Sequence, residues 1–196
     1  REGVFFVCSA LAEVRSEAAV LRRAPAHVSI YTPRIWTPPQ PLPAPAVPPV
    51  VVGAGPGGLF SALVLAQAGL RPILLERGRC VERRKEDVER FWRTGQLDLT
   101  SNVQFGEGGA GAFSDGKLNT GTKDLRHRFI LEQLVACGAP EDILIDAKPH
   151  VGTDYLHIAL KGLRRRLLEL GADIRFETRL TDLEIQDSAL TAILAH

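Results

Sequence analysis

A cluster of glycines with the spacing of a nucleotide-binding turn occupies residues 53–58, in the order Gly-Ala-Gly-Pro-Gly-Gly. Three valines at 50–52 come directly before the cluster, and an apolar run at 59–68 follows it. This order predicts a short buried strand, a tight turn and a helix, which is the context that makes a Gly-x-Gly-x-x-Gly pattern informative. The chemistry that such a turn supports is the binding of a dinucleotide pyrophosphate.

Each residue of the cluster has a distinct role in that interpretation. Gly53 permits the sharp bend, Gly55 lets the backbone come close to the pyrophosphate, and Gly58 lets the helix pack on the strand. Pro56 and Gly57 complete the turn at the helix N-terminus. The free N–H groups and the dipole of that terminus attract an anion.

A carboxylate supplies the second half of the nucleotide-binding pattern. Glu76 ends the next predicted strand, at 72–76. An acidic residue at this place accepts hydrogen bonds from the adenosine ribose and repels a 2′-phosphate, so the pattern predicts FAD or NAD in preference to NADP. A glycine-rich turn with an unrelated surface glutamate is the alternative. This alternative is disfavoured, because both strands, the helix, the glycines and the acid all occur at the expected spacing.

A glycine-rich loop at 95–122 is too long to be an idle connection. Its glycines between 106 and 111 leave much backbone uncovered, as a loop approaching an anion or a flavin requires. Lys117 is positioned to neutralise phosphate charge or to favour negative charge on a reduced flavin. Asp115 is expected to bond its own loop backbone. His150 is either a proton donor near a flavin or a structural loop histidine.

Longer runs around these motifs resemble known flavoproteins. G-A-G-P-G-G-L at 53–59 and I-L-L-E-R-G at 73–78 resemble FAD-binding oxidoreductases of the glutathione-reductase and p-hydroxybenzoate-hydroxylase type. N-V-Q-F-G-E-G-G-A-G-A-F-S-D-G-K-L-N-T at 102–120 and K-P-H-V-G-T-D-Y-L at 148–156 resemble one group within them, the predicted FAD-dependent dehydrogenases. That resemblance extends over about 50–186 and favours FAD over NAD.

The resemblance implies specific contacts with FAD. The turn glycines would contact the pyrophosphate, and Glu76, with Arg77 beside it, would contact the adenosine ribose. Gly108 and Gly109 would offer backbone N–H groups along the loop toward the isoalloxazine. Leu180, in the strand after the long helix, would bind adenine through its backbone.

The surrounding pattern predicts an α/β fold, namely an incomplete Rossmann-like FAD-binding domain at 50–196 with three layers and a parallel sheet. Residues 1–32 are expected to form a small partial αβ segment. Residues 33–49, which contain eight prolines, are expected to form a semi-rigid linker. The remaining helices are expected at 81–93, 124–137 and 153–170, and the remaining strands at 4–8, 27–31, 173–178, 180–186 and 189–194. A helix is also expected at 10–23.

Composition narrows the classes of partner. The net charge of +1 does not indicate nucleic acid or a membrane surface, and Arg164–Arg166 are interpreted as a solvated helix face. The apolar run at 50–70 contains five glycines and a proline, which favours strand, turn and helix over a membrane span. The three cysteines lie far apart, which predicts no disulfide or metal site, ordinary buried or half-buried thiols, and a cytoplasmic location.

The leading hypothesis is an FAD-dependent oxidoreductase of dehydrogenase type, with an unknown small-molecule substrate and NAD(P)H as a candidate electron donor. The sequence identifies no catalytic residue. Flavoproteins of this type usually return late in the chain with a Gly-Asp motif, and no Gly-Asp dipeptide occurs here. By the resemblance, this is an N-terminal fragment that binds FAD weakly or not at all when alone, and is inactive.

Two alternatives stay open at this point: a non-catalytic module that binds FAD or NAD, and a tRNA-modifying flavoprotein. Reduction of the flavin by NADH or NADPH would separate an enzyme from a structural module. Salt-sensitive RNA binding would favour the tRNA-modifying protein, although the near-neutral charge argues against it.

Overall fold

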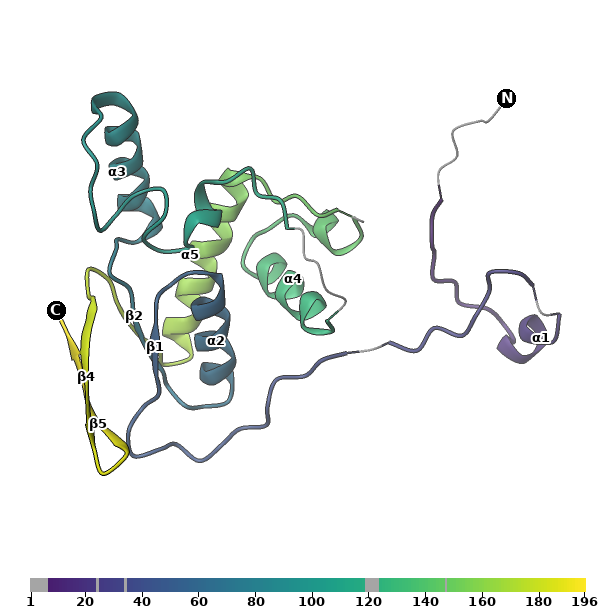
Figure 1. Ribbon diagram of the computed structural model, residues 1–196. Helices are drawn as coiled ribbons and strands as arrows, with labels where there is room; N and C mark the ends of the chain where they lie inside the picture. The colour runs from purple at the N-terminus through teal and green to yellow at the C-terminus, as the bar shows by residue number, and fades with distance from the viewer. Residues whose placement is uncertain (1–6, 24, 34, 119–123, 147) are drawn as a thin grey trace. The chain divides into compact units, whose positions relative to one another are not determined.

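A computed structural model describes residues 7–23, 25–33, 35–118, 124–146 and 148–196 (Figure 1). Part of the expected first strand, residues 4–6, and the last two residues of the 102–120 motif lie outside this description. The chain divides into two compact units, residues 1–35 and residues 36–196.

The first unit contains one short helix, α1 (Glu17–Arg22), which begins where the Ser16 side chain accepts a hydrogen bond from the Ala19 N–H. The helix was expected to begin near residue 10 and is therefore shorter. Residues 27–31 form no strand, in contrast to the expectation. None of the residues of α1 is buried, so this unit lacks the apolar support that would hold a strand against it.

The second unit is built around a parallel sheet, as the sequence predicted. β1 (Val50–Val52) pairs with β2 (Ile73–Leu75), and β2 pairs with β3 (Asp173–Arg175). Both pairs are parallel and the strand order is β1-β2-β3. β3 was expected to continue to residue 178, but Glu177 has a φ of +52°, which takes the backbone out of the extended conformation.

Six helical segments of four residues or more accompany the sheet in the described part of this unit. They are α2 (Pro56–Gln67), α3 (Val81–Thr94), α4 (Arg126–Ala136), α5 (Thr153–Glu169) and two 3₁₀ turns, η1 (Ala110–Phe113) and η2 (Glu141–Leu144). Figure 1 shows α2 and α5 on the same side of strands β1 and β2. The core lies between them, where Leu63, Leu163 and Leu167 are buried.

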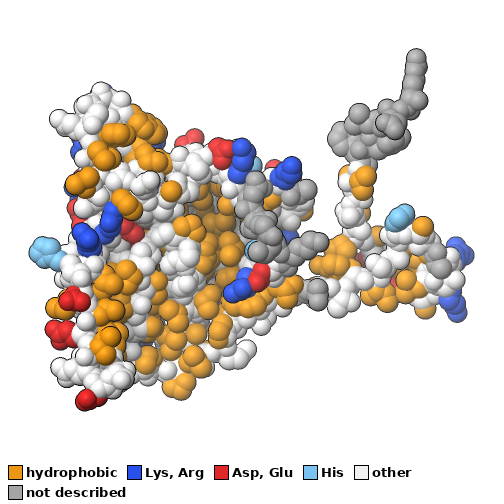
Figure 2. Space-filling view, viewed as in Figure 1, with side chains coloured by type: hydrophobic (Ala, Val, Ile, Leu, Met, Phe, Trp, Pro, Cys, Tyr) orange, Lys and Arg blue, Asp and Glu red, His pale blue; other side chains and the backbone are white. Residues whose placement is uncertain are grey.

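An antiparallel hairpin, β4 (Leu180–Gln186) and β5 (Ala189–Ala195), follows the parallel sheet. Figure 1 shows it on the side of the sheet opposite α2. Leu183, Ile185, Leu190 and Leu194 of the hairpin are exposed, and Figure 2 shows hydrophobic side chains in a row on this part of the surface. The hairpin completes the layered arrangement of hairpin, parallel sheet and helices.

The proline-rich stretch is attached to the second unit over part of its length. The ring of Trp36 packs edge-on against Phe129, with centroids 4.7 Å apart. The Leu42 N–H donates to the Ala68 carbonyl over 3.0 Å. These contacts hold residues 36–42 on the helices, whereas the predicted role of 33–49 as a spacer stays a prediction.

Among the described residues, no helix is both long and apolar enough to cross a membrane. The cytoplasmic location inferred from the cysteines stays a prediction. The cysteines themselves differ in exposure: Cys137 is buried and Cys80 half-buried, but Cys8 is exposed, contrary to the expectation for it.

Candidate nucleotide-binding site

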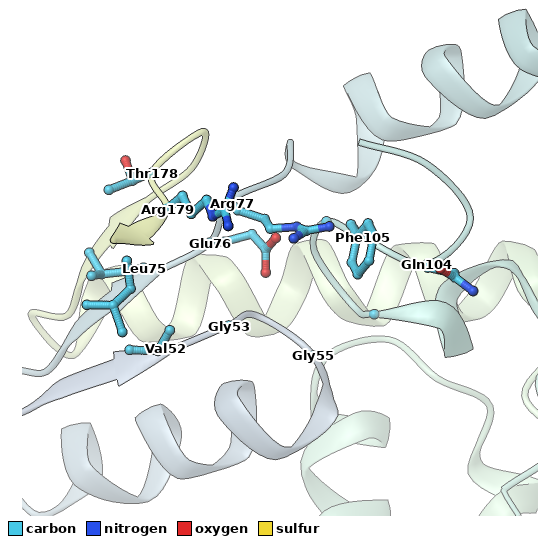
Figure 3. Close-up of a pocket in the computed structure, with 13 residues that line it drawn as sticks. Val52, Gly53, Gly55, Leu75, Glu76, Arg77, Gln104, Phe105, Thr178 and Arg179 are labelled. Atoms are coloured by element: carbon cyan, nitrogen blue, oxygen red, sulfur yellow. The ribbon is translucent and has the colours of Figure 1, made fainter. Parts of the chain in front are cut away.

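A cavity of about 420 Å³ lies at the carboxyl ends of β1 and β2 (Figure 3). Ligands of open parallel sheets bind at this end of the strands. Four segments far apart in the sequence form its walls. The lining residues are Val52, Gly53, Gly55, Leu75, Glu76, Arg77, Gln104, Phe105, Gly106, Gly109, Thr178, Arg179 and Leu180.

The glycine turn forms one wall. Gly53 has a φ of +92°, a conformation that side chains rarely adopt, and its N–H donates to the Leu75 carbonyl over 2.7 Å. A Cβ on Gly58 would lie 1.8 Å from the Gly53 carbonyl oxygen, so only glycine lets α2 begin this close to β1. A Cβ on Gly55 or Gly57 would meet no atom within 4 Å, which leaves open space beside the turn.

The N-terminus of α2 opens at the same wall. Gly55 is the N-cap and supplies no side chain to satisfy the first N–H groups of the helix, and Pro56 is the first helical residue. Pro56 has no N–H to leave unpaired, and its fixed φ suits this position. The next N–H groups, at Gly57 and Gly58, are those that an anion at a helix N-terminus would receive.

Glu76 closes the base of the turn. Its buried carboxylate accepts a 2.7 Å hydrogen bond from the Ala54 N–H and another 2.7 Å hydrogen bond from the Gly78 N–H. Figure 3 shows the carboxylate directed toward the glycine turn. Each carboxylate oxygen can accept more than one hydrogen bond, so the ribose contact predicted for Glu76 is compatible with this structural role.

Arg77 lies at the opposite wall. Its guanidinium carbon is 3.4 Å from the centroid of the Phe105 ring, a close cation–π contact. Figure 3 shows the guanidinium stacked on that ring, away from the turn. Neither Phe105 nor its neighbour Gln104 was predicted as a site residue, although both belong to the unusual 102–120 motif.

The two predicted loop glycines have different surroundings. Gly109 lines the cavity, and a Cβ there would approach the Gly55 Cα to 3.3 Å. The Gly108 N–H instead donates to the Ala54 carbonyl over 2.7 Å. A Cβ on Gly108 would lie 2.5 Å from a methyl carbon of Leu160. The geometry therefore gives Gly108 a role in packing the loop against α5, and its contact with a cofactor stays a prediction.

Lys117 is not among the residues that line the cavity. Its exposed Nζ lies 2.7 Å from a carboxylate oxygen of Asp115, an ion pair that raises the pKa of Lys117 through a hydrogen bond and charge attraction. The Lys117 N–H also donates to Asp115, which confirms the predicted bonding of Asp115 to its own loop. His150 Nε2 contacts the Asp115 carbonyl oxygen, so this histidine is a structural part of the loop.

Leu180 lies on the cavity wall, where the sequence placed it. Arg179, the preceding residue, exchanges two backbone hydrogen bonds with His196, of 2.7 and 2.9 Å. Because alternate residues of an antiparallel strand bond to opposite sides, the N–H and C=O of Leu180 are directed away from β5. This orientation suits the predicted backbone contact with adenine, which stays a prediction.

Buried charges behind the 102–107 segment were missed by the sequence analysis. Arg164 lies between two carboxylates, 2.5 Å from Glu82 and 2.7 Å from Glu107. Burial raises the pKa of Glu107 to about 7 in spite of this pairing. Burial acts in the same direction on Glu82 and is the largest single influence there. The hydrogen bond and charge of Arg164, together with further hydrogen bonds, outweigh it and lower the pKa of Glu82 to about 2. One guanidinium thus serves two acids, and the fully buried acid retains its proton more strongly.

The interpretation of Arg164–Arg166 as a solvated face is therefore wrong for its first member. Arg165 and Arg166 are exposed, but the Arg164 side chain is only 19% exposed and is held in the two ion pairs. Helical periodicity placed the three arginines mostly opposite the apolar face of α5, which carries leucines at positions 156, 160, 163, 167 and 170. It could not show that α3 and the glycine-rich loop cover part of that face.

Comparison with known proteins identifies the family. Residues 46–196 match the family model described as FAD binding domain. A Clostridium beijerinckii protein named "Uncharacterized protein" is 50% identical over 148 residues, which cover 76% of this chain and 28% of that protein. The chain therefore spans less than a third of this relative.

Solved structures give weaker likenesses. THI4 of Thermovibrio ammonificans is 17% identical with a TM-score of 0.43, over 76% of this chain and 47% of that protein. The 3-ketosteroid-delta4-(5alpha)-dehydrogenase of Rhodococcus jostii RHA1 is 19% identical with a TM-score of 0.42, over 75% and 41%. At these TM-scores the structural likenesses add nothing to the family match.

Proposed function

Because the chain belongs to the FAD binding domain family, whose cofactor is FAD, we propose that it holds the ADP portion of FAD in a flavoprotein oxidoreductase of dehydrogenase type. The observation that carries the proposal is the convergence of six predicted contacts on one cavity. The residues that line the same space come from four separate segments and are Gly53, Gly55, Glu76, Arg77, Gly109 and Leu180.

The residues of this cavity fit a nucleoside diphosphate such as the ADP portion of FAD. The open space beside Gly55 is where a side chain would otherwise lie, and the N-terminus of α2 offers N–H groups to a pyrophosphate there. Glu76 lines the same cavity and would accept hydrogen bonds from the ribose hydroxyls. The Leu180 backbone lines it as well and would bind adenine. The size of the cavity lies within the range of ligand pockets.

The division of labour follows from the side chains present. FAD, when bound, supplies the redox chemistry, and the protein binds and orients it. Among the described residues that line the cavity, Glu76 is the only one with a carboxyl group, and it accepts hydrogen bonds from two backbone N–H groups. The cavity residues therefore bind and orient the cofactor and move no proton. A small-molecule substrate and NAD(P)H as electron donor are part of the proposal.

A competition experiment tests which part of FAD the chain holds. The full-length protein is titrated with FAD, ADP and FMN, and binding is followed by calorimetry. We expect FAD and ADP to compete and to bind within about tenfold of each other, because the lining residues contact the portion they share. FMN, which lacks the adenosine, should not compete. Competition by FMN without competition by ADP would overturn the proposal, as would the absence of FAD binding.

The oxidoreductase part of the proposal needs a second readout. With FAD bound, addition of NADH or NADPH should bleach the visible flavin absorption if the protein accepts electrons from a nicotinamide. An unbleached flavin with both donors would remove NAD(P)H from the proposal and leave the nucleotide site intact.

A further inference from the structure

Arg84, on α3, is the largest side chain of the described residues that is completely buried. Burial lowers the pKa of its guanidinium to about 10, so the group still carries its charge at neutral pH. Burying a charge is costly unless the charge is well hydrogen-bonded. The partners that Arg84 uses therefore indicate what the buried charge is for.

The hydrogen-bond partners of Arg84 are backbone carbonyls of a single loop segment, residues 102–107. Nε donates to the Asn102 carbonyl over 2.8 Å, and Nη2 donates to the Val103 carbonyl over 2.8 Å. Nη1 donates to the Glu107 carbonyl over 2.7 Å and, at 3.4 Å, to the Gly106 carbonyl. The planar guanidinium thus spans both ends of the segment, which a lysine ammonium cannot do.

The residues between these two ends form the cavity wall opposite the glycine turn. Gln104, Phe105 and Gly106 all line the cavity. Gly106 has a φ of +118°, and a Cβ there would lie 2.5 Å from Arg84 Cδ, so the loop is fitted closely to the arginine. Arg77 in turn stacks on Phe105 and depends on the position of that ring.

We propose that Arg84 is a positioning residue for the cofactor. By joining the two ends of segment 102–107, its guanidinium fixes the wall formed by residues 104–106 and so sets the affinity for the ADP portion of FAD. Arg84 acts through the loop and does not itself line the cavity. This inference rests on the proposed function.

A pair of adjacent arginines on α3 provides the test and its control. Arg84→Lys keeps the positive charge but cannot reach both ends of the segment, so the dissociation constant for FAD should rise at least tenfold, the factor that follows from losing even one charged hydrogen bond. Arg83 is exposed and pairs with Glu177 over 3.8 Å, away from the segment. Arg83→Lys should change the constant less than about twofold.

Chemical rescue separates positioning from general damage to the fold. In Arg84→Ala, methylguanidinium should restore most of the affinity for FAD, because the vacated space can accept a guanidinium. Sodium chloride at equal concentration should not. If Arg84→Ala does not fold, the Arg84→Lys comparison decides the matter.

The outcomes distinguish the two proposals. If the full-length wild-type protein binds neither FAD nor ADP, the proposed function fails. If the wild type binds FAD and Arg84→Lys binds it within about twofold, only the role of Arg84 is overturned. An affinity lost in Arg84→Ala that methylguanidinium does not restore also overturns it.

Discussion

The wall of the cavity at residues 53–58 and the wall at residues 104–106 are held in place by different means. The first depends mainly on its own glycines, which leave room for a helix that begins at once, and Glu76 bonds the turn from beyond β2. The second is held from behind by Arg84, a charged side chain of a distant helix that is completely buried. A binding site can thus combine one wall whose function is lost when a side chain is added with another whose function is lost when a side chain is removed.

This contrast predicts opposite responses to mutation. Adding a side chain to the glycine turn should damage packing or fill the cavity, depending on which glycine is changed. Removing a polar group behind the other wall should leave buried hydrogen-bonding groups without partners. The predictions below test each side of the contrast.

Gly58→Val should have the largest effect on stability. Its Cβ would lie 1.8 Å from the Gly53 carbonyl oxygen, so α2 would have to move away from β1. We expect the free energy of unfolding, measured in urea, to fall by more than about 4 kcal/mol, or the folded state to be lost. Gly111→Val is the control, because its Cβ would meet no atom within 4 Å. A loss below about 1 kcal/mol in Gly58→Val would contradict the packing account.

Glu76→Ala should have an intermediate effect. The substitution leaves the buried N–H groups of Ala54 and Gly78 without acceptors, and we expect a loss of about 2–4 kcal/mol in the free energy of unfolding. Glu76→Gln keeps one acceptor oxygen and should lose about half as much. Equal losses in the two variants would mean that the carboxylate's two hydrogen bonds do not support the turn.

Glu107 should make stability depend on pH, with the smallest effect of the three. Its pKa in the folded protein, about 7, lies above its ordinary value of 4.5, so the folded state binds the proton more tightly. The free energy of unfolding should therefore fall by about 2–3 kcal/mol as the pH rises from 4.5 to 7, and then level off.

The matched comparison for that measurement is Glu107→Gln, which removes the titrating group. Burial lowers the pKa of His157 and acts in the opposite direction within this pH range, but His157 is present in both proteins. The difference between their stability curves therefore isolates Glu107. A difference that does not change between pH 4.5 and 7 would exclude the raised pKa.

Local patterns were sufficient to predict the parallel sheet, α2, α5 and the turn between β1 and α2. Gly58 and Glu76 are recognisable because their roles depend on a fixed spacing from one strand. Arg84 and Glu107 could not be recognised in the same way, since their burial arises only when α3, α5 and the loop meet. Arg164 shows the limit most clearly: its place on the helix predicts exposure, and its tertiary neighbours reverse that prediction.

The N-terminal strands were expected from short apolar runs, and residues 27–31 show why such runs are insufficient. A strand needs a partner for its backbone groups, and a run of apolar residues does not supply one. The end of β3 has a comparable cause, because the backbone conformation at Glu177 could not be read from the alternation of side chains.

The central claim, that the space beside the glycine turn is occupied by the FAD pyrophosphate, is tested most directly by FAD titration of Gly55→Val in the full-length protein. The new side chain would enter open space, so the melting temperature should stay close to that of the wild type and of Gly111→Val. FAD binding should be lost in Gly55→Val. A folded Gly55→Val protein that binds FAD as tightly as the wild type would contradict the claim.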